Sequence, residues 1–174
     1  MKVGLLSDTH DRLPAIESLL TYMQGLGVHI VLHAGDFCAP FALKPFVDLN
    51  MPVIGVFGRN DGDHEGLRAF AQRGVGIELF EGPHSMELGG KRILMVHDIS
   101  DANPRSLENH QIVIHGFTHR EEMKHRADTL IVNPGEGCGW LHGEPSGAIL
   151  DLQTSDVQFF KLRDVLTPKP LPDE

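Results

Sequence analysis

The sequence predicts an α/β fold in which two mixed β-sheets pack face to face and helices flank them. The first half of the 174-residue chain alternates short apolar runs with segments of helical periodicity, whereas the second half is mostly short strand-like runs between turn residues. Strands that alternate with helices favour parallel pairing, and consecutive short strands favour a second sheet. Since 41% of the residues are hydrophobic, a chain of this length can bury a complete core.

Three buried parallel strands and three helices are predicted in the first half. The strands are the continuous apolar runs 3–6, 30–32 and 53–57. The first helix carries an apolar stripe from Leu13 to Met23 and ends at the glycines that follow. The second helix covers 41–49 and is interrupted by Pro45, and the third covers 63–72.

The second half is predicted to be mainly β-structure. Runs 85–88 and 92–96 form a hairpin around two adjacent glycines. Further strands are expected over 112–115, 123–126, 130–133, 148–153 and 157–161. No linker interrupts this order, so residues 1–165 are predicted to form a single domain, followed by a Pro-rich C-terminal tail over 166–174.

The composition argues against several classes of protein. A formal net charge of -9 argues against a general nucleic-acid-binding surface, although a bound metal ion can reverse the local sign for a phosphorylated substrate. Neither a signal peptide nor a transmembrane run is recognised, which predicts a cytoplasmic protein with no membrane partner. Two cysteines are too few for a disulfide framework, and 11 histidines beside one Tyr and one Trp hint at metal chemistry.

Each of five apolar runs ends in residues that can bind a metal ion. Ligand sites in open α/β sheets lie beyond the carboxyl ends of the strands, so these residues are expected to converge. They are Asp8 and His10, then Asp36, then Asn60 and Asp61, then His97, and finally His115 and His119. Carboxylate oxygens and imidazole nitrogens together suit divalent transition metals. One such run would mean little, but five favour a cluster of polar side chains that could form a metal site.

Several of these residues have an ordinary structural interpretation when each is taken alone. A solvated or capping Asp explains most Asp-x-His pairs, and a His that ends an apolar strand, such as His97, is more often a core residue. Cys38 is expected to be a small buried hydrophobe, and Glu136 and Cys138 receive no role. The remaining histidines are expected on the surface or in loops: His29, His33, His64, His84, His110, His125 and His142.

Taken together, the motifs resemble the signature of the calcineurin-like metallophosphoesterases, and most of all the small single-domain bacterial and archaeal phosphodiesterases. The matching segments are Asp8-Thr9-His10, Gly35-Asp36, Gly58-Arg59-Asn60-Asp61, His97, Gly116-Phe117-Thr118-His119 and Asn133-Pro134-Gly135. The resemblance implies an αββα sandwich that holds two divalent ions. It also implies which residues bind them: Asp8, His10, Asp36 and His119 hold the first ion, and Asp36 bridges to a second ion that His97 also binds.

The sequence departs from the family pattern at the second ion. The family has Asn where this chain has Arg59, and His where this chain has Phe117. Both missing residues are ligands of the second ion in the family, whereas every residue expected at the first ion is present. Because a guanidinium is always charged and matches phosphate geometry, we hypothesise that Arg59 takes the place of the second ion and neutralises a phosphoryl oxygen.

Two neighbouring residues offer alternative ligands for the second ion. Asn60 would reach the ligand position through a one-residue bulge, and His115 would reach it by turning inward. A slip of one residue at a strand end usually points the side chain to the opposite face, which argues against both. Asp61 is expected to orient a ligand rather than to bind the ion itself.

The resemblance implies metal-dependent hydrolysis of a phosphate ester, and of a small-molecule phosphodiester in particular. Mn²⁺ is the expected ion, with Fe, Zn, Ni or Mg as alternatives, and one or two ions per chain. Arg59 would stabilise charge on the phosphoryl oxygens, and His97 would position or protonate the leaving oxygen if it does not bind an ion. The alternative is a catalytically weak or inactive family member that binds a nucleotide or a protein, as the retromer scaffold subunit of similar fold does. Exposed sheet edges would allow a homodimer.

Overall fold

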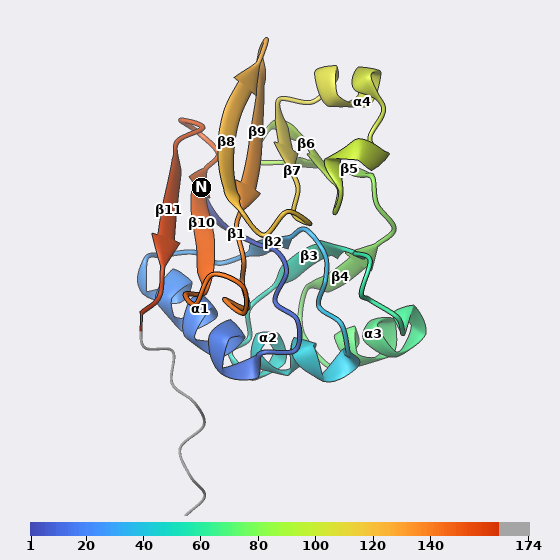
Figure 1. The fold of residues 1–174 in the computed structure, drawn as a ribbon, viewed down its shortest axis with the longest axis vertical. Coiled ribbons are helices and arrows are strands. Elements are labelled where there is room, and N and C mark those ends of the chain that lie inside the picture. The colour runs from blue at the N-terminus through green and yellow to red at the C-terminus, as the bar shows by residue number, and fades with distance from the viewer. Residues whose placement is uncertain (164–174) are drawn as a thin grey trace, which may run out of the picture.

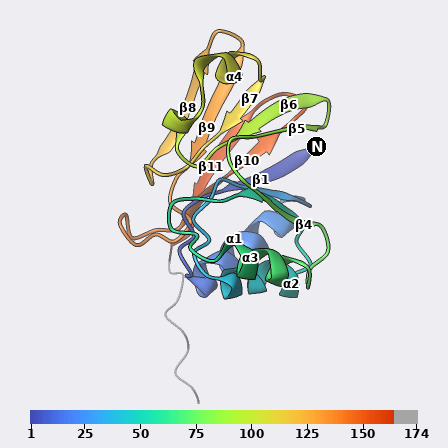
Figure 2. The same ribbon diagram turned by 90° about the vertical axis from the view of Figure 1, so that its right-hand side faces the viewer.

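Two β-sheets lie between layers of helices in a computed structural model that describes residues 1–163 (Figures 1 and 2). From edge to edge, the six-stranded sheet contains β11 (Val157–Lys161), β10 (Ser146–Asp151), β1 (Lys2–Leu6), β2 (Val31–His33), β3 (Val53–Val56) and β4 (Ile77–Phe80). The five-stranded sheet contains β5 (His84–Leu88), β6 (Lys91–Met95), β7 (Ile112–Ile114), β9 (Thr129–Pro134) and β8 (Glu121–Arg126). The predicted fold class, two packed mixed sheets with flanking helices, is confirmed.

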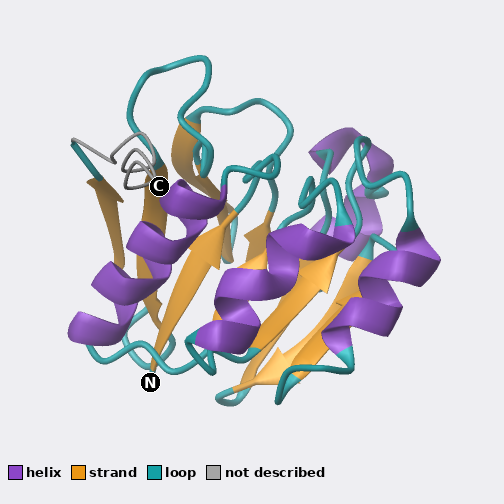
Figure 3. Cartoon of the chain, turned by 90° about the horizontal axis from the view of Figure 1, so that it is seen from below, coloured by secondary structure: helices purple, strands orange, loops and turns teal. Residues whose placement is uncertain are grey.

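The helices of the first half cover the outer face of the six-stranded sheet (Figure 3). They are α1 (Leu13–Gly25), the 3₁₀ turn η1 (Pro40–Leu43), α2 (Lys44–Asp48) and α3 (His64–Ala71). Pro45 divides the predicted helix over 41–49 into η1 and α2. It lies in the first turn of α2, where its missing N–H has no intrahelical partner to lose. The side chain of Asp63 caps α3 by accepting a hydrogen bond from the amide of Gly66.

Three elements were not predicted from the sequence. They are β4, the 3₁₀ turn η2 (Ile99–Asp101) and α4 (Pro104–Glu108). The last two contain only three and five residues, which is too short for a helical period to show. β4 is an edge strand whose residues are mostly only partly buried, so it lacks the continuous apolar run that marks the central strands.

The core is divided into layers by the alternation of side chains along the strands. Ile93 and Met95 on β6 face the space between the two sheets, whereas Leu94 and Val96 face α4 on the outer side. Leu5 on β1 likewise faces the second sheet, while the neighbouring Leu6 packs with the helices. The two sheets are therefore buried on both faces wherever a helix covers them, as Figure 2 shows.

The strands that carry the predicted ligands run parallel within each sheet. β1, β2, β3 and β4 pair in parallel, and so do β6, β7 and β9. Their carboxyl ends are therefore brought to one side of each sheet, where the connecting loops meet. No helix within residues 1–163 is long and apolar enough to cross a membrane. The predicted tail over 166–174 and the predicted domain end at residue 165 lie outside the described residues.

Candidate metal centre

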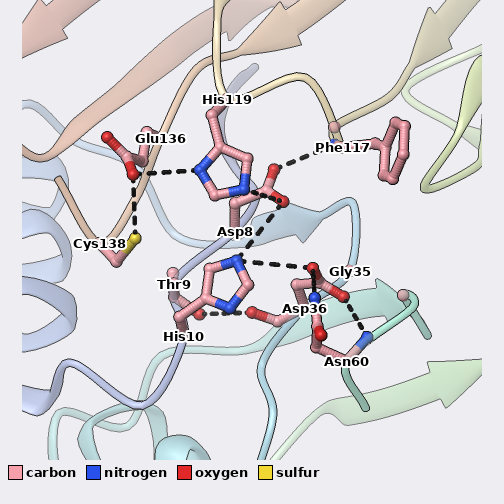
Figure 4. A network of polar contacts seen from close by, with 12 residues as sticks. Asp8, Thr9, His10, Gly35, Asp36, Asn60, Phe117, His119, Glu136 and Cys138 are labelled. Atoms are coloured by element: carbon pink, nitrogen blue, oxygen red, sulfur yellow. Dashed lines mark hydrogen bonds and ion pairs between the residues drawn. The ribbon is translucent and has the colours of Figure 1, made fainter. Parts of the chain in front are cut away.

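The candidate ligands lie on loops that follow five strands, three from the first sheet and two from the second (Figure 4). Asp8 and His10 follow β1, Asp36 follows β2, and Asn60 follows β3, whereas His97 and His119 follow β6 and β7. Backbone hydrogen bonds join these loops to one another. The amide of Asp8 donates to the carbonyl of Gly35 (3.0 Å), and the amide of Gly116 donates to the carbonyl of His97 (2.9 Å).

The loops adopt backbone conformations that are costly for residues other than glycine. Among residues 1–163, ten non-glycine residues have a positive φ, and seven of them lie in or beside this centre. These seven are Asp8, His10, Asp11, Asp36, Cys38, Phe117 and His119. Such conformations persist only where the surrounding contacts hold them, and they concentrate at functional sites. At Gly35, with φ +100°, a Cβ atom would lie 2.7 Å from Nδ1 of His97, so only glycine allows this close approach.

Three imidazoles point their Nε2 atoms toward two carboxylates. Nε2 of His119 lies 3.4 Å from Oδ1 of Asp8, and Nε2 of His10 lies 3.8 Å from the same oxygen. Nε2 of His97 and Nε2 of His10 lie 3.4 Å and 3.5 Å from Oδ2 of Asp36. Figure 4 shows His10 and His119 stacked one above the other, with both carboxylates on the same side of the pair.

Several of these converging atoms are buried without a hydrogen bond. Among residues 1–163, Oδ1 of Asp8 and the Nε2 atoms of His10 and His97 are inaccessible to solvent and have no hydrogen-bond partner. Asp8 is fully buried, and Asp36 and His97 are exposed by only 2% and 4%. An unpaired buried polar atom is costly. Divalent cations bound among these atoms would remove that cost, so the donor set fits a metal centre.

Charge interactions within the cluster change the protonation of its members. The Asp8 carboxylate raises the pKa of His10, against the opposing effect of burial, and Asp36 adds to that rise. Burial works to lower the pKa of His97, but the Asp36 carboxylate outweighs it and the pKa is raised. Burial would raise the pKa of Asp36, yet His97 and the amides of Asn60 hold it well below its usual range. A cation would compete with protons on the imidazoles.

Asp61 joins the loops after β2 and β3 instead of touching a ligand side chain. Its Oδ2 accepts hydrogen bonds from the amides of Gly58 (2.6 Å) and Asp36 (3.0 Å), and its Oδ1 accepts one from the amide of Cys38 (2.6 Å). Because both oxygens are engaged and only 4% of the residue is exposed, Asp61 fixes the backbone that carries Asp36. This agrees with an orienting role rather than with a reactive carboxylate.

Asn60, and not Arg59, reaches the cluster. The amide N–H of Asn60 donates to Oδ1 of Asp36 (2.8 Å), and its side-chain Nδ2 lies 2.7 Å from Oδ2. The guanidinium of Arg59 instead donates to Asp98 (3.1 Å) and Asp101 (3.2 Å). The hypothesis that Arg59 takes the place of an ion is therefore not supported by this geometry. The rule against a one-residue slip does not apply, because residues 59 and 60 lie in a turn beyond the end of β3.

Neither Phe117 nor His115 supplies the missing imidazole. Phe117 stands at the rim of the cluster, 45% exposed, and its amide donates to Oδ2 of Asp8 (3.1 Å). His115 is buried, but its Nε2 lies 3.1 Å from Oε2 of Glu122 on β8. The suggested inward turn of His115 toward the second ion is thus not seen.

Sequence reasoning gave no role to Glu136, which the structure places against His119. Its Oε1 accepts a hydrogen bond from Nδ1 of His119 (3.1 Å) and another from the amide of Leu141 (2.8 Å), and its Oε2 accepts one from the amide of His142 (2.9 Å). Burial works to raise the pKa of Glu136, but these hydrogen bonds hold it below its usual value. The only signal in the sequence was a lone acidic residue in a glycine-rich loop.

The chain belongs to the calcineurin-like phosphoesterase superfamily. Residues 1–155 match that superfamily's domain. The predicted family is confirmed, and with it the predicted class of enzyme, a phosphoesterase. The two departures at positions 59 and 117 therefore belong to a genuine member of the family.

Known proteins similar to this chain include an archaeal enzyme. Phosphodiesterase MJ0936 of Methanocaldococcus jannaschii is 32% identical over 163 residues, which is 91% of this chain and 97% of that protein. A solved archaeal phosphodiesterase superposes with a TM-score of 0.85 at 31% identity, covering 93% of this chain and all of that one. The Escherichia coli phosphoesterase Yfce shares the fold, with a TM-score of 0.69 at 18% identity over 94% of this chain and all of that one.

Proposed function

We propose that this chain hydrolyses a phosphodiester of a small molecule with the aid of at least one bound divalent ion. The observation that carries the proposal is the set of buried donor atoms without partners, Asp8 Oδ1, His10 Nε2 and His97 Nε2, which converge from both sheets. Membership of the phosphoesterase superfamily and the similarity to an archaeal phosphodiesterase support the reaction class.

The residues form two sets of ligands, and the set for the second ion has fewer members. Asp8, His10, Asp36 and His119 would hold the first ion, as the family resemblance implies. For a second ion, Asp36 would be shared, and His97 and Asn60 would be the additional ligands. Since a phenyl ring cannot replace an imidazole as a ligand, we expect the second ion to bind more weakly than the first.

The chain's own residues orient the ligands and the leaving oxygen and supply a proton. A bound divalent ion acidifies a coordinated water molecule and offsets negative charge on a phosphoryl group. Asp61 keeps the loops of Asp36 and Asn60 together through three amide hydrogen bonds. When His97 does not bind an ion, its Nε2 would position or protonate the leaving oxygen, since the carbonyl of Ala34 holds its Nδ1 (2.8 Å) and the Asp36 carboxylate favours its protonated form.

Arg59 receives a different role from the one predicted from the sequence. Its side chain is 53% exposed at the rim and paired with two carboxylates. Such a guanidinium contributes to the local electrostatic potential, but its two acidic partners and solvent weaken its effect on the charge of a phosphoryl oxygen.

We propose Mn²⁺ as the native ion and the cytoplasm as the location. A homodimer stays a prediction.

The test combines metal content with turnover. We expect purified protein to bind Mn²⁺ through Asp8 and to hydrolyse bis(4-nitrophenyl) phosphate only when the ion is present. Asp8→Asn should lower metal-dependent turnover by about 100-fold or more, because the ion loses a buried anionic ligand. Asp48→Asn, an exposed carboxylate on α2, is the matched control and should leave turnover unchanged.

The outcomes separate the competing functions. Turnover that survives both chelation and Asp8→Asn would overturn the proposal. Tight Mn²⁺ binding without turnover would favour the alternative of an inactive nucleotide- or protein-binding member.

In the same assay, Phe117→His should raise the Mn²⁺ content from near one ion per chain toward two, since it returns an imidazole to the neighbourhood of His97.

A further inference from the structure

The two residues that depart from the family pattern touch each other. Cζ of Arg59 lies 5.6 Å from the ring centroid of Phe117, which is within the range of a cation–π contact. Arg59 follows β3 in the first sheet, and Phe117 follows β7 in the second. Two exchanges that are 58 positions apart in the sequence thus form one physical unit at the rim of the metal centre.

Both members of this pair are held in place. The guanidinium of Arg59 is fixed by Asp98 and Asp101, on the loop that follows His97. The amide of Phe117 is tied to the Asp8 carboxylate, and its backbone has φ +68°. A bulky residue in this conformation is strained and persists only where contacts over-determine it. The ring is thus presented at a defined position.

The ring of Phe117 contacts the buried ligand His97 and is itself exposed to solvent. Its centroid is 5.7 Å from that of His97, with an interplanar angle of 80°, so the ring meets the imidazole edge to face. Asp8, Asp36 and His97 are buried, whereas Arg59, Asn60 and Phe117 are exposed. A group bound at the ligands on the side of His97 would therefore have the exposed ring of Phe117 as a neighbour.

We propose that Phe117, backed by Arg59, is a stacking platform that selects phosphodiesters with a planar aromatic ester group. This inference rests on the proposed function, because it requires a phosphoryl group at the metal centre. A phosphodiester has two ester groups, and only one of them leaves. The group that stays would lie against the ring of Phe117, where an aromatic plane gains stacking that an alkyl group lacks. Arg59 makes the platform rigid.

The test holds the leaving group constant and changes the group that stays. Phenyl 4-nitrophenyl phosphate and methyl 4-nitrophenyl phosphate both release 4-nitrophenolate, so the ratio of their kcat/KM values reports on the remaining group. Phe117→Leu keeps an apolar side chain but removes the aromatic plane. We expect it to lower the phenyl-to-methyl ratio about three- to tenfold, the factor that aromatic pairing typically supplies.

Trp140→Leu is the matched control. Trp140 is also an exposed aromatic residue paired with an arginine, since Cζ of Arg12 lies 4.8 Å from its ring. It lies two residues after Cys138, which Figure 4 shows on the other side of the stacked imidazoles from Phe117. Its replacement should leave the ratio unchanged. An equal fall in both variants would overturn the assignment to Phe117.

A double-mutant cycle tests whether the pair acts as one unit. Arg59→Gln should lower the ratio in the wild-type background and add little to Phe117→Leu, because the two changes disable the same platform. Fully additive effects would contradict a shared platform.

A third substrate, thymidine 5′-(4-nitrophenyl phosphate), distinguishes a nucleobase from an aryl ester as the aromatic group that stacks. A fall in its relative rate in Phe117→Leu assigns a nucleobase, and a fall for the phenyl ester alone assigns an aryl ester.

Failure of the platform and failure of the proposed function give different results. If wild-type protein with Mn²⁺ hydrolyses neither ester, the proposed function fails. If it hydrolyses both esters and the ratio is the same in wild type and Phe117→Leu, the function stands and the platform is wrong. Thermal melting of each variant confirms that it is folded before the ratios are compared.

Discussion

At the scale of single residues, the state of each imidazole is set by the group at its Nδ1 atom. Nδ1 of His119 faces the Glu136 carboxylate, and Nδ1 of His97 faces the carbonyl of Ala34. A carboxylate or a carbonyl can only accept, so each Nδ1 carries the proton and each Nε2 keeps its lone pair for a metal ion. Within residues 1–163, the hydrogen-bond partner of Nδ1 of His10 is the thiol of Cys38, at 3.3 Å, which is a weaker partner than a carboxylate or a carbonyl.

Glu136→Gln is the residue-scale prediction. Glutamine has the same shape, but it offers one oxygen where Glu136 uses two, and its NH₂ group would face an amide N–H of the 136–142 loop. His119 would then lose its anionic partner. We expect Mn²⁺ affinity to fall about tenfold, as is usual when a carboxylate behind a ligating His is lost. Isothermal titration calorimetry measures it.

The control for Glu136 lies on the same loop. Glu144 pairs with Arg163, and within residues 1–163 it makes no hydrogen bond or ion pair with His119, so Glu144→Gln should bind Mn²⁺ as the wild type does. Wild-type affinity in Glu136→Gln would show that the carboxylate does not tune His119. Equal losses in both variants would point to a general loosening of the loop.

At the scale of elements, short strands place residues that support the ligands from behind. His33 ends β2, three residues before Asp36, and is completely buried. Its Nδ1 accepts a hydrogen bond from the amide of Gly35 (3.2 Å), so its Nε2 carries the proton and donates to Oγ1 of Thr9 (3.1 Å). The ring stacks on Phe37 at 3.8 Å. The expectation that His33 is a surface or loop residue is wrong.

Burial makes His33 a source of pH-dependent stability. Desolvation, aided by the nearby His97, lowers the pKa of His33 to about 3, whereas the unfolded chain protonates it near 6.5. Since only the unfolded state gains the proton between these values, stability falls as the pH falls below 6.5. The loss from this residue between pH 6.5 and 5 should be about 2 kcal/mol. His33→Gln should remove this part of the pH slope.

Urea unfolding at several pH values measures this slope. His125→Gln, on the exposed strand β8, is the control and should keep the wild-type slope. An unchanged slope in His33→Gln would mean that His33 does not stay neutral in the folded protein. Any loss of stability at acid pH would then come from other groups.

The same elements show which features a sequence can predict. The central strands and α1 were predictable, because their burial leaves continuous apolar runs or a helical stripe. Asp8, His10, Asp36 and His119 were predictable as a group from their positions after such runs. The contact of Asn60 with Asp36 was not, because it depends on a turn after β3 that carries no periodicity. The partnership of Glu136 with His119 depends on two loops meeting in space, which one sequence does not show.

At the scale of the whole molecule, the metal centre joins the two sheets. Asp8, His10 and Asp36 come from loops of the first sheet, and His97 and His119 come from loops of the second. A bound ion would therefore stabilise the packing between the sheets as well as the loops. Without an ion, the raised pKa values of His10 and His97 let imidazolium–carboxylate pairs hold the loops together.

Saturating Mn²⁺ should raise the melting temperature, and by more at pH 8 than at pH 6. An ion at 100 times its Kd adds about 2.7 kcal/mol, which corresponds to about 5–10 °C for a domain of this size. The pairs of protonated His10 and His97 stabilise the ion-free protein fully below pH 6.5, and this contribution is lost as the pH rises through their folded pKa. The ion requires neutral imidazoles, so its own contribution grows over that same interval.

Differential scanning fluorimetry with and without a chelator measures this shift. Asp8→Asn should abolish the response to Mn²⁺ at both pH values. A rise that is equal at pH 6 and pH 8 would contradict competition between the ion and protons for the imidazoles.

The return of the chain to the first sheet has a consequence for biosynthesis. β1, which leads directly to Asp8, lies between β2 and β10 in the sheet, and β10 begins only at Ser146. A nascent chain that has emerged as far as His119 thus exposes every ligand while β1 still lacks a neighbour on one side. All the ligands are synthesised before β10, the strand that completes the pairing of β1. We therefore expect a chain that ends before Ser146 to hold a metal ion less firmly than the finished protein.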